Sequence, residues 1–353
     1  MSTLIIPCGG RSSRFPNMKP KWMLTHPDGN IMVRKAIEGI DISIFDRFII
    51  TIIDEHDKKY DASLVLRQAF DYLNQLKGYP KLELCILNSF TKSASETIVQ
   101  TLIKMNVEGS FVVKDSDNKI AFKNLSENYI VGCEIEDFPI NNLQGKSYLH
   151  VNDSDTIYGI VEKKIVSSTI CLGAYCFLDP QQFIKSYNTL LQKYSDKEMY
   201  ISAVVQDLIS KGISFRYVKA ENYSDWGTLI EWKKEQKNHI TIFTDFDGVL
   251  IQNSGKYGKL NWDNNDKMLE KNCERLRKLQ NNGAQIIVTT ARPEKYKEKI
   301  KELLTKQGIF PYAILTGLNH AQRVLINDFA PTNPYPSALA INIKRNSDLQ
   351  DYI

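Results

Sequence analysis

The 353-residue sequence contains no apolar run long enough to span a bilayer and no cationic start leading into a short apolar secretion segment. It contains no Cys-x-x-Cys pair, because its six cysteines are scattered along the chain. A net charge of +4 over this length is too small to favour a nucleic acid or a membrane surface as partner. These absences argue against membrane-spanning, disulfide-framework and zinc-cluster proteins. We expect a reduced, cytoplasmic protein with no nucleic-acid or membrane partner.

The length and the apolar pattern indicate the fold class. A chain of this length is expected to form two domains, and 42% apolar with 24% charged residues is typical of a globular protein. Apolar runs that suit buried strands, such as 47–53 and 82–87, alternate with segments of helical spacing, such as 31–40 and 60–76. This alternation predicts an α/β fold, whose ligands gather at the carboxyl ends of the strands.

The first loop of the chain suits a phosphate group. The apolar run 4–6 predicts a buried strand, and it leads into a turn with two glycines. Glycine lets the backbone approach a ligand closely, and backbone N–H groups with fixed cations favour a polyanion. An ordinary basic surface loop would have the same composition. The candidate residues are Gly9, Gly10, Arg11, Ser12, Ser13, Arg14 and Lys21.

The segment PCGGRSSRF, followed by Pro20-Lys21, resembles the signature loop of the sugar-phosphate nucleotidyltransferases. The resemblance implies that the glycine turn wraps the triphosphate of a nucleotide. It also implies that Arg14 and Lys21 are catalytic and offset the charge of that triphosphate. Ser12 stands where the family usually has a glycine, so the loop is expected to be tighter or to contact phosphate through a hydroxyl.

Acids occur at two distant places in this first part of the chain. Asp115 and Asp117 follow the apolar run 109–114. In an extended backbone their spacing would place both carboxylates on one face, although an Asp/Asn turn after a strand is a plainer interpretation. The resemblance favours a Mg²⁺ site and assigns it to Asp117 together with Asp225 of the segment DWGT.

Two further segments match the pattern of the same family. Ser93 and Glu96 form a capping box, which is a structural explanation, while the resemblance places this turn beside the nucleobase of the substrate. Further along, the resemblance implies that Glu162 accepts hydrogen bonds from sugar hydroxyls and that Lys163 is a catalytic residue that holds the sugar phosphate. A solvated Glu-Lys-Lys on a strand edge is the plainer interpretation of that segment.

A second set of motifs follows the polar segment 229–238, where we expect the boundary between domains 1–237 and 238–353. Asp245 and Asp247 end an apolar strand, and the period of two directs both carboxylates the same way. This Asp-x-Asp-Gly segment resembles motif one of the haloacid-dehalogenase (HAD) phosphatases.

The later motifs of that family follow in order. The expected strand 285–289 ends in hydroxyls that include Thr290, and the expected strand 323–326 leads to Asp328. Strand ends that carry an acid pair, a hydroxyl and an acid are suited to a phosphate and Mg²⁺.

The HAD resemblance implies a role for each of these residues. Asp245 would attack phosphorus to form an aspartyl phosphate, and Asp247 would protonate the leaving oxygen and later deprotonate water. Asp245, Asp247 and Asp328 would hold Mg²⁺. Thr290 and Arg323 would bind the phosphoryl oxygens.

This second domain departs from the HAD pattern in two places. Asn327 stands where the family often has an acid, and Arg323 is the residue available where it usually has lysine. A folded but inactive phosphatase is therefore an alternative. Between Asp245 and Thr290 we expect a loop and one helix, 266–281, which leaves room for a minimal cap only.

Together these motifs predict two α/β domains. The first is a Rossmann-like, mixed-sheet (GT-A-like) nucleotidyltransferase, and the second is a smaller Rossmann-like HAD domain. We expect a bifunctional enzyme of the capsule or surface-polysaccharide type. The first domain would join a nucleoside triphosphate, with CTP favoured, to a sugar or polyol phosphate and release pyrophosphate. The second would be a Mg²⁺-dependent phosphomonoesterase acting on a metabolite of the same pathway.

Two other functions are compatible with the same motifs. In the first of these alternatives, the nucleotidyltransferase is active, whereas the HAD domain is catalytically silent and serves binding or oligomerisation. In the second, the whole protein is a regulatory nucleotide-binding protein. The sequence does not decide between a monomer and a homo-oligomer.

Overall fold

A computed structural model gives the structure of most of the chain, and it divides into two compact units, Met1–Trp232 and Lys233–Ile353. This division falls five residues before the boundary expected from the sequence. Each unit is described here by itself. The structure describes residues 1–124, 126–140, 142–194, 198–253, 262, 267–328 and 338–353.

The first unit contains eleven of the strands formed by the described residues. They are β1 (Ser2–Pro7), β2 (Arg47–Ile53), β3 (Leu82–Leu87), β4 (Ser110–Lys114), β5 (Asn118–Ala121), β6 (Tyr129–Glu134), β7 (Ser147–Val151), β8 (Thr156–Glu162), β9 (Thr169–Phe177), β10 (Phe215–Lys219) and β11 (Asn222–Asp225).

Helices alternate with these strands. The α-helices are α1 (Met32–Ala36), α2 (Asp54–Tyr60), α3 (Ala62–Phe70), α4 (Ala94–Lys104), α5 (Pro180–Lys193), α6 (Ile201–Ser210) and α7 (Leu229–Asn238). The short 3₁₀ helices are η1 (Lys21–Met23), η2 (Ile42–Ile44), η3 (Asp71–Gln75) and η4 (Leu143–Gly145).

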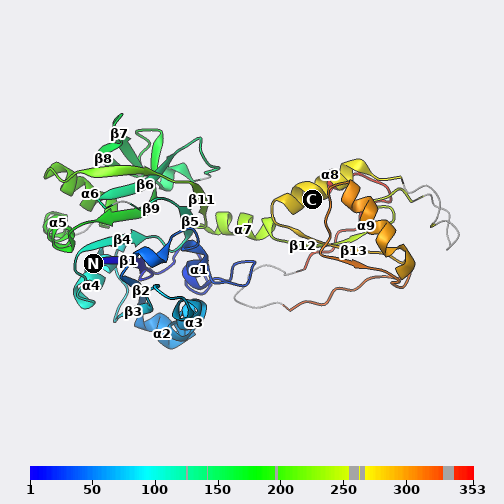
Figure 1. Ribbon diagram of the computed structural model, residues 1–353, viewed down its shortest axis with the longest axis horizontal. Coiled ribbons are helices and arrows are strands. Elements are labelled where there is room, and N and C mark those ends of the chain that lie inside the picture. Colours follow the sequence, from blue (N-terminus) through cyan, green and yellow to red (C-terminus); the bar gives the residue numbers. More distant parts are fainter. Residues whose placement is uncertain (125, 141, 195–197, 254–261, 263–266, 329–337) are drawn as a thin grey trace. The chain divides into compact units, whose positions relative to one another are not determined.

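Nine of these strands form one mixed sheet among the described residues, in the order β3-β2-β1-β4-β9-β6-β10-β8-β7. β1, β2, β3 and β4 run parallel, whereas β9 is antiparallel to both β4 and β6. The parallel half follows from the strand–helix alternation, because parallel strands need crossover connections. Its carboxyl edge carries the loop that follows β1 (Figure 1).

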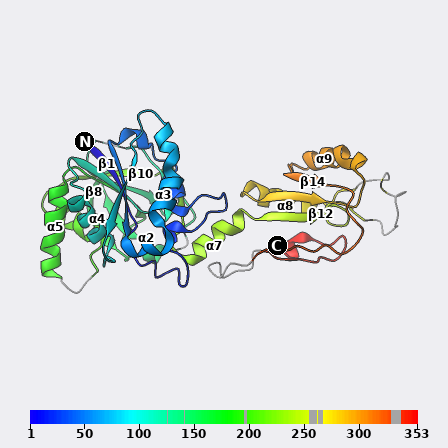
Figure 2. The ribbon, with the colours of Figure 1, turned by 90° about the horizontal axis from the view of Figure 1, so that it is seen from below.

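Apolar clusters cover both faces of this sheet. Leu66 and Phe70 of α3 pack into one cluster, which includes Phe48 of β2. Ile98 of α4 and Val204 of α6 pack into the other cluster. Figure 2 shows α4 and α5 on one side of the sheet and α3 on the other. Burial of both faces explains why β2 and β9 are almost continuously apolar.

A small second sheet brings two distant segments together. β5 and β11 pair antiparallel, and Asn118 lies opposite Asp225. The N–H of Trp226 donates to the carbonyl of Asp117 at 2.9 Å. This pairing fixes the residues that flank both strands at one end of the small sheet, although more than a hundred positions separate them in the sequence.

The second unit is built around a three-stranded parallel sheet, β12-β13-β14, within the part of the chain that the structure describes. Its elements are β12 (Thr241–Asp245), α8 (Glu270–Asn281), β13 (Gln285–Thr289), η6 (Glu294–Tyr296), α9 (Lys297–Lys306), β14 (Ala313–Leu315) and η7 (Leu349–Asp351). Its core is separate from that of the first unit and includes Phe246, Leu276 and Val288.

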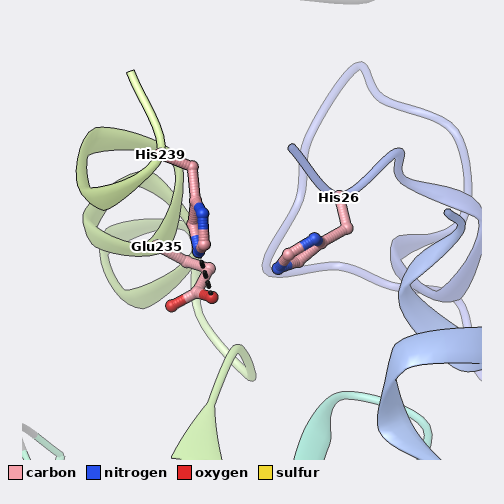
Figure 3. Close-up of side chains that lie close together, drawn as sticks. All are labelled: His26, Glu235 and His239. Atoms are coloured by element: carbon pink, nitrogen blue, oxygen red, sulfur yellow. Dashed lines mark hydrogen bonds and ion pairs between the residues drawn. The ribbon is translucent and has the colours of Figure 1, made fainter. Parts of the chain in front are cut away.

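The last turns of α7 carry a local polar pair that belongs to the second unit. Figure 3 shows Glu235 and the ring of His239, which follows the helix, pointing toward one another. His239 Nε2 lies 3.3 Å from Glu235 Oε1. A pair four residues apart stabilises the end of a helix modestly.

Several strand predictions are confirmed, including 47–53 and 82–87. The helix expected over 31–40 is wrong in length, because α1 covers Met32–Ala36 and a tight turn follows at Gly39, whose φ is +111°. All six cysteines are buried, and none of them is paired in a disulfide. No helix among the described residues is both long and apolar enough to cross a membrane.

Candidate active site

A polar cleft with a cavity volume of about 610 Å³ lies in the first unit. It is lined by the loop after β1, the start of α4, the segment after β4 and the turn after β11. Most of the residues expected to bind substrate contribute to it: Gly10, Arg11, Ser12, Ser13, Arg14, Lys21, Ser93, Asp117, Glu162, Lys163 and Asp225. The cleft therefore unites motifs that the sequence presents far apart.

The loop after β1 depends on an unusual backbone conformation at Ser12. Its φ is +51°, in the left-handed region that glycine adopts most easily. The Ser12 hydroxyl compensates by accepting a hydrogen bond from the N–H of Lys21 at 3.0 Å. The Ser12 hydroxyl therefore helps to close the loop, and its own hydrogen can still be donated to a phosphate. Gly9 has little room for a side chain, because a Cβ there would lie 2.9 Å from Thr97 Oγ1.

Three cations of this loop are placed by different contacts. The Arg11 guanidinium stacks over the ring of Phe90, with 4.5 Å between its carbon and the ring centre. Arg14 Nη1 donates to the carbonyl of Gly227 at 3.5 Å. Lys21, at the start of η1, forms an ion pair with Asp117. Arg14 and Lys21 therefore converge on the acids, whereas Arg11 lies on the side of Phe90.

Asp117 and Asp225 converge around Gly227. A Cβ built on Gly227 would lie 3.1 Å from Asp117 Oδ2 and 3.1 Å from Asp225 Oδ1. Two carboxylate oxygens thus face one small space that only a glycine leaves open. Hard carboxylate oxygens in this arrangement fit Mg²⁺, which takes one or two carboxylates and keeps several waters. Burial would raise the pKa of Asp117, but Lys21, with the charges of Lys114 and Lys146, outweighs burial and holds that pKa below its usual value.

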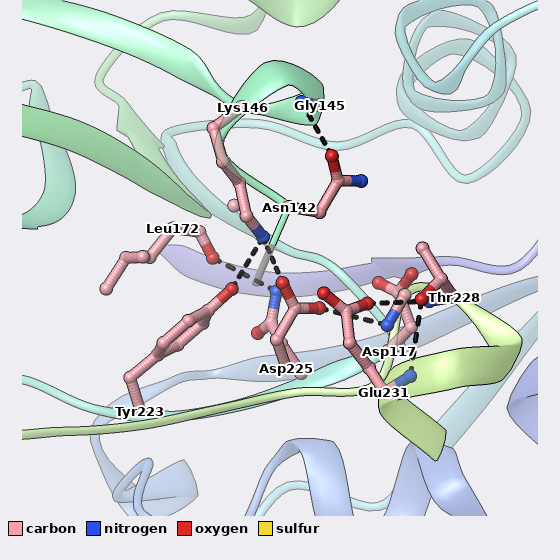
Figure 4. Close-up of polar contacts among 12 residues, drawn as sticks. Asp117, Asn142, Gly145, Lys146, Leu172, Tyr223, Asp225, Thr228 and Glu231 are labelled. Atoms are coloured by element: carbon pink, nitrogen blue, oxygen red, sulfur yellow. Dashed lines mark hydrogen bonds and ion pairs between the residues drawn. The ribbon is translucent and has the colours of Figure 1, made fainter. Parts of the chain in front are cut away.

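Lys146 is a central residue of this site that the sequence analysis did not identify. It follows η4, its ammonium forms an ion pair with Asp225, and it donates to the Tyr223 hydroxyl at 2.7 Å (Figure 4). Burial would lower the pKa of Lys146, but its charge and hydrogen-bond interactions with Asp225, together with the charges of Asp117 and Glu231, outweigh burial and raise that pKa. Lys146 therefore holds Asp225 in place as a permanent cation.

Lys114 and Asp115 lie next to the two aspartates: Lys114 is fully buried, and Asp115 is half-buried and lines the same cleft. The Lys114 ammonium donates to the carbonyls of Asp115 and Asn118 at 2.7 and 2.8 Å. Burial lowers the pKa of Lys114 and raises the pKa of Asp115, whose carboxyl also feels the charge of Asp117. The expectation that Asp115 and Asp117 share one strand face is wrong, because β4 ends at Lys114.

The opposite wall of the cleft carries Glu162 and Lys163. The hydroxyls of Ser147 and Ser202 donate to Glu162 Oε2 at 2.5 and 2.7 Å. Lys163 lies in the turn after β8 with a φ of +53°, and its ammonium contacts the Tyr200 hydroxyl at 2.5 Å. Both side chains line the cleft, so this wall offers a fixed acceptor and a cation at its rim.

Ser93 and Glu96 shape the start of α4. The Ser93 hydroxyl accepts from the N–H of Glu96 at 3.2 Å, which confirms the expected cap. The Glu96 carboxylate turns back to the N–H of Lys92 at 2.6 Å. Ser93 lines the cleft, whereas the lining does not include Glu96 or Gly9.

Glu231 lies in the wall of the cleft beside Asp225, on the first turn of α7. The N–H of Thr228 donates to Glu231 Oε2 at 2.9 Å, and the Thr228 hydroxyl accepts from the N–H of Glu231 at 3.3 Å. Burial and the charge of Asp225 raise the pKa of Glu231. The spacing Thr-x-x-Glu is a capping signal that is visible in the sequence, although it was not noticed there.

Comparison with known proteins locates the fold of this unit. No protein-family model and no curated protein sequence matches the chain. A nucleoside-diphosphate-sugar pyrophosphorylase from Vibrio cholerae RC9 has a similar solved structure, with a TM-score of 0.54 and 20% identity over 66% of this chain and 98% of that chain. The structure of the inositol-1-phosphate CTP transferase from T. maritima has a TM-score of 0.50 and 12% identity, over 67% of this chain and 95% of that chain. The structure of a UDP-glucose pyrophosphorylase complexed with UDP-glucose has a TM-score of 0.51 and 13% identity, over 67% of this chain and 97% of that chain.

The N-terminal unit has the fold of these nucleotidyltransferases. Because the identities are low, the likeness concerns the arrangement of helices and strands.

The second unit holds a smaller polar cluster at the carboxyl end of β12. Arg292 donates to Asp247 Oδ1 through Nη2 at 2.8 Å and through Nε at 3.1 Å. The Thr290 hydroxyl donates to Asp247 Oδ2 at 3.0 Å. Arg292, almost completely buried, was missed in the sequence, although it lies only two positions after Thr290.

Asp245 lies next to this cluster, at the last position of β12. Burial raises the pKa of Asp245, and the charge of Asp247 adds to the effect, while Arg323 opposes it. Arg323 Nη2 lies 3.5 Å from Asp245 Oδ1. Two of the expected phosphate ligands, Thr290 and Arg323, are thus attached to the two acids of the motif.

The strand expected over 323–326 is wrong. The segment forms no β-ladder in the described part of the unit, and Val324 and Ile326 are 76% and 89% exposed. An apolar run becomes a strand only where a neighbouring strand offers its backbone, and β12 pairs only with β13 among the described residues. Asp328 lies in the same irregular segment and is exposed.

Proposed function

We propose that the N-terminal unit transfers a nucleotidyl group from a nucleoside triphosphate to a sugar or polyol phosphate and releases pyrophosphate. The observation that carries this proposal is the convergence of Arg14 and Lys21 with Asp117 and Asp225 around Gly227, in one cleft. Cations for a polyphosphate and oxygen ligands for a divalent ion are the two requirements of such a transfer.

The reaction would proceed by attack of a phosphate oxygen of the acceptor on the α-phosphorus. A new P–O bond forms while the bond to the β-phosphate oxygen breaks, and pyrophosphate leaves. Arg14 and Lys21 would offset the charge that develops on the triphosphate. Mg²⁺ held by Asp117 and Asp225 would supply further charge neutralisation. Most of the rate enhancement in such a transfer comes from positioning and electrostatics.

The wall with Glu162 and Lys163 would bind the acceptor. Because both serine hydroxyls bind Oε2, the other carboxylate oxygen of Glu162 has no hydrogen-bond partner among the described residues and can accept from a sugar hydroxyl. Lys163 would hold the phosphate of the acceptor. The turn at Ser93 would lie beside the base.

A coupled assay for pyrophosphate release tests this function. The assay would combine the four nucleoside triphosphates with mixed sugar and polyol phosphates and Mg²⁺, and we expect release with CTP above the others. The preference for CTP has its support in the likeness of the fold to the inositol-1-phosphate CTP transferase. Absence of release with every combination would contradict catalysis and favour a regulatory nucleotide-binding protein.

We further propose that the second unit is a Mg²⁺-dependent phosphomonoesterase of the HAD type. The acid pair Asp245 and Asp247, with Thr290 and Arg323 attached to it, supports this function. Asp245 would be the nucleophile, Asp247 the general acid, and Asp328 a further ligand of the metal. Arg292 donates charge-assisted hydrogen bonds to Asp247, and this supports the silent alternative because the general acid would have to give up these bonds to reach a substrate.

Hydrolysis of p-nitrophenyl phosphate decides between these two alternatives for the second unit. Activity that Asp245→Asn abolishes would support the phosphatase, and activity unchanged by that substitution would contradict it. The bifunctional enzyme would then serve the synthesis of a nucleotide-activated building block for a surface polysaccharide in the cytoplasm.

A further inference from the structure

The carboxylate of Glu231 is only half explained by its role as a helix cap. Glu231 is 5% exposed, and Oε2 accepts the N–H of Thr228 at the start of α7. Oε1 is buried and has no hydrogen-bond partner among the described residues. An unpaired oxygen of a buried carboxylate is costly, of the order of 1–3 kcal/mol or more.

The cap does not require a charge at this position. A glutamine could accept the same N–H through its amide oxygen and would avoid the cost of burying a carboxylate. The lysines of the site do not supply a partner either, because Lys21 contacts Asp117 and Lys146 contacts Asp225. Within the described part of the chain no cation lies within 4.0 Å of the Glu231 carboxylate.

Figure 4 shows the Glu231 carboxylate beside that of Asp225, with Thr228 on its other side. The charges of both Asp225 and Lys146 act on Glu231, and Glu231 lines the same cleft. The Glu231 carboxylate therefore lies beside the space around which the two aspartates converge.

We propose that Glu231 is a third carboxylate of the divalent-cation site and that its Oε1 serves the cation and its bound waters. This inference rests on the proposed nucleotidyl transfer and deepens it. Mg²⁺ is bound by few carboxylates and keeps several waters, so an additional acceptor oxygen next to Asp225 has a chemical use. Acceptors of this kind fix the orientation of a metal's ligands and affect its affinity.

Binding of Mn²⁺ to the full-length chain tests the proposal. All variants would carry Asp245→Asn, so that the nucleophile of the second unit does not contribute to binding. We would measure the Mn²⁺ dissociation constant by electron paramagnetic resonance, with and without CTP, and the thermal midpoint of each variant. Glu231→Gln keeps the cap through its amide oxygen and removes the charge. We expect its dissociation constant to rise about tenfold, with a thermal midpoint that is unchanged or higher because the buried charge is removed.

Three comparison variants give the test its specificity. Asp225→Asn should weaken Mn²⁺ binding. Asp179→Asn makes the same chemical change at the cap of α5, where Asp179 accepts from the N–H of Gln181 at 2.8 Å, and it should leave binding unchanged. Thr228→Val removes the other half of the α7 cap and retains the carboxylate, so it should bind Mn²⁺ like the parent chain.

Three results would overturn the proposal. If Glu231→Gln binds Mn²⁺ like the parent while Asp225→Asn does not, Glu231 is a cap only and the proposed transfer is unaffected. If Thr228→Val weakens binding as much as Glu231→Gln, the effect comes through the start of the helix. If the parent binds no Mn²⁺ with or without CTP, the metal site of the proposed function fails as well.

Discussion

Ser12 combines an unfavourable backbone conformation with a hydrogen bond that compensates for it. Because its φ is +51°, a glycine would adopt the same conformation at lower cost, by roughly 1 kcal/mol. The bond from the N–H of Lys21 to its hydroxyl stabilises the loop by about 1 kcal/mol in return. Serine and glycine at this position are therefore two solutions of nearly equal energy for the same turn.

This balance predicts different outcomes for two small substitutions. Ser12→Ala keeps the strained conformation and loses the bond, so it should lower the free energy of unfolding by about 1 kcal/mol. Ser12→Gly loses the bond and relieves the strain, so it should stay within about 0.5 kcal/mol of the parent. Urea unfolding followed by tryptophan fluorescence measures both. Equal destabilisation by the two substitutions would contradict this account.

Lys35 is the centre of a charge network that controls stability in acid. Its ammonium lies 2.7 Å from Asp28 and 2.6 Å from Glu38, and Lys119 lies 3.3 Å from Glu38. Burial alone would raise the pKa of each carboxyl. The bonds to Lys35, together with the Asn30 N–H and His26 at Asp28 and Lys119 at Glu38, outweigh burial and lower both pKa values. A carboxyl with a lowered pKa in the folded state takes up its proton first in the unfolded chain.

We therefore expect the stabilisation by this network to be fully present above the ordinary carboxyl pKa values of 3.8 and 4.5 and to be lost as the pH falls through the lower folded values. Urea unfolding between pH 6 and pH 3 should show a steeper loss of stability for the parent chain than for Lys35→Met. Lys58→Met is the matched control, because Lys58 pairs with Asp54 on the surface. An identical pH dependence for the parent chain and Lys35→Met would refute the assignment.

At the scale of elements, Gly173 allows β9 to lie close to Asp115 in the candidate site. Its φ is +78°, and a Cβ there would lie 2.1 Å from Asp115 Oδ2. The N–H of Asp115 donates to the carbonyl of Gly173 at 2.8 Å, so neither backbone can move away freely. The strand thus needs glycine for both its conformation and its space.

Gly173→Ala should lower the free energy of unfolding by about 2–5 kcal/mol, the sum of a left-handed backbone cost and an overpacking cost. Gly78→Ala measures the backbone cost without the overpacking cost, because Gly78 has a φ of +86° but open space around its Cβ position. We expect this control substitution to lower the free energy of unfolding by about 1–2 kcal/mol. Equal losses for both substitutions would show that the contact with Asp115 is relieved without cost.

The sequence was most informative where local pattern and tertiary structure agree. The run that became β2 is almost continuously apolar, and the run that became β3 is apolar apart from Glu83, so the bounds of both strands follow directly from the pattern. The segment 323–326 has a similar pattern, but its state depends on whether a distant strand edge accepts it, which composition does not encode.

The site follows the same division. The loop residues Arg14 and Lys21 were predicted because they lie in one recognisable segment. Lys146 was not, because it lies in a stretch with little pattern and becomes important only when β11 brings Asp225 beside it. A buried arginine such as Arg292 is likewise invisible until its partner Asp247 is placed.

At the scale of the whole molecule, each unit has its own hydrophobic core. The first unit buries apolar residues on both faces of its large sheet, and the second buries a separate set around Leu276 and Val288. The acids of the first site and those of the second are accordingly supported by different cores. Substitutions at independent sites usually act additively.

The two proposed activities should therefore be separable in the full-length chain. Asp225→Asn should reduce pyrophosphate release by at least about a hundredfold, because it removes charge that stabilises the transition state, and leave hydrolysis of p-nitrophenyl phosphate within about twofold. Asp245→Asn should have the reverse effect, because it removes the nucleophile of the second reaction. Measuring both rates in each variant and in the double variant gives a complete cycle. Loss of both activities in either single variant would mean that the two sites depend on one another, and the argument from separate cores would then be wrong.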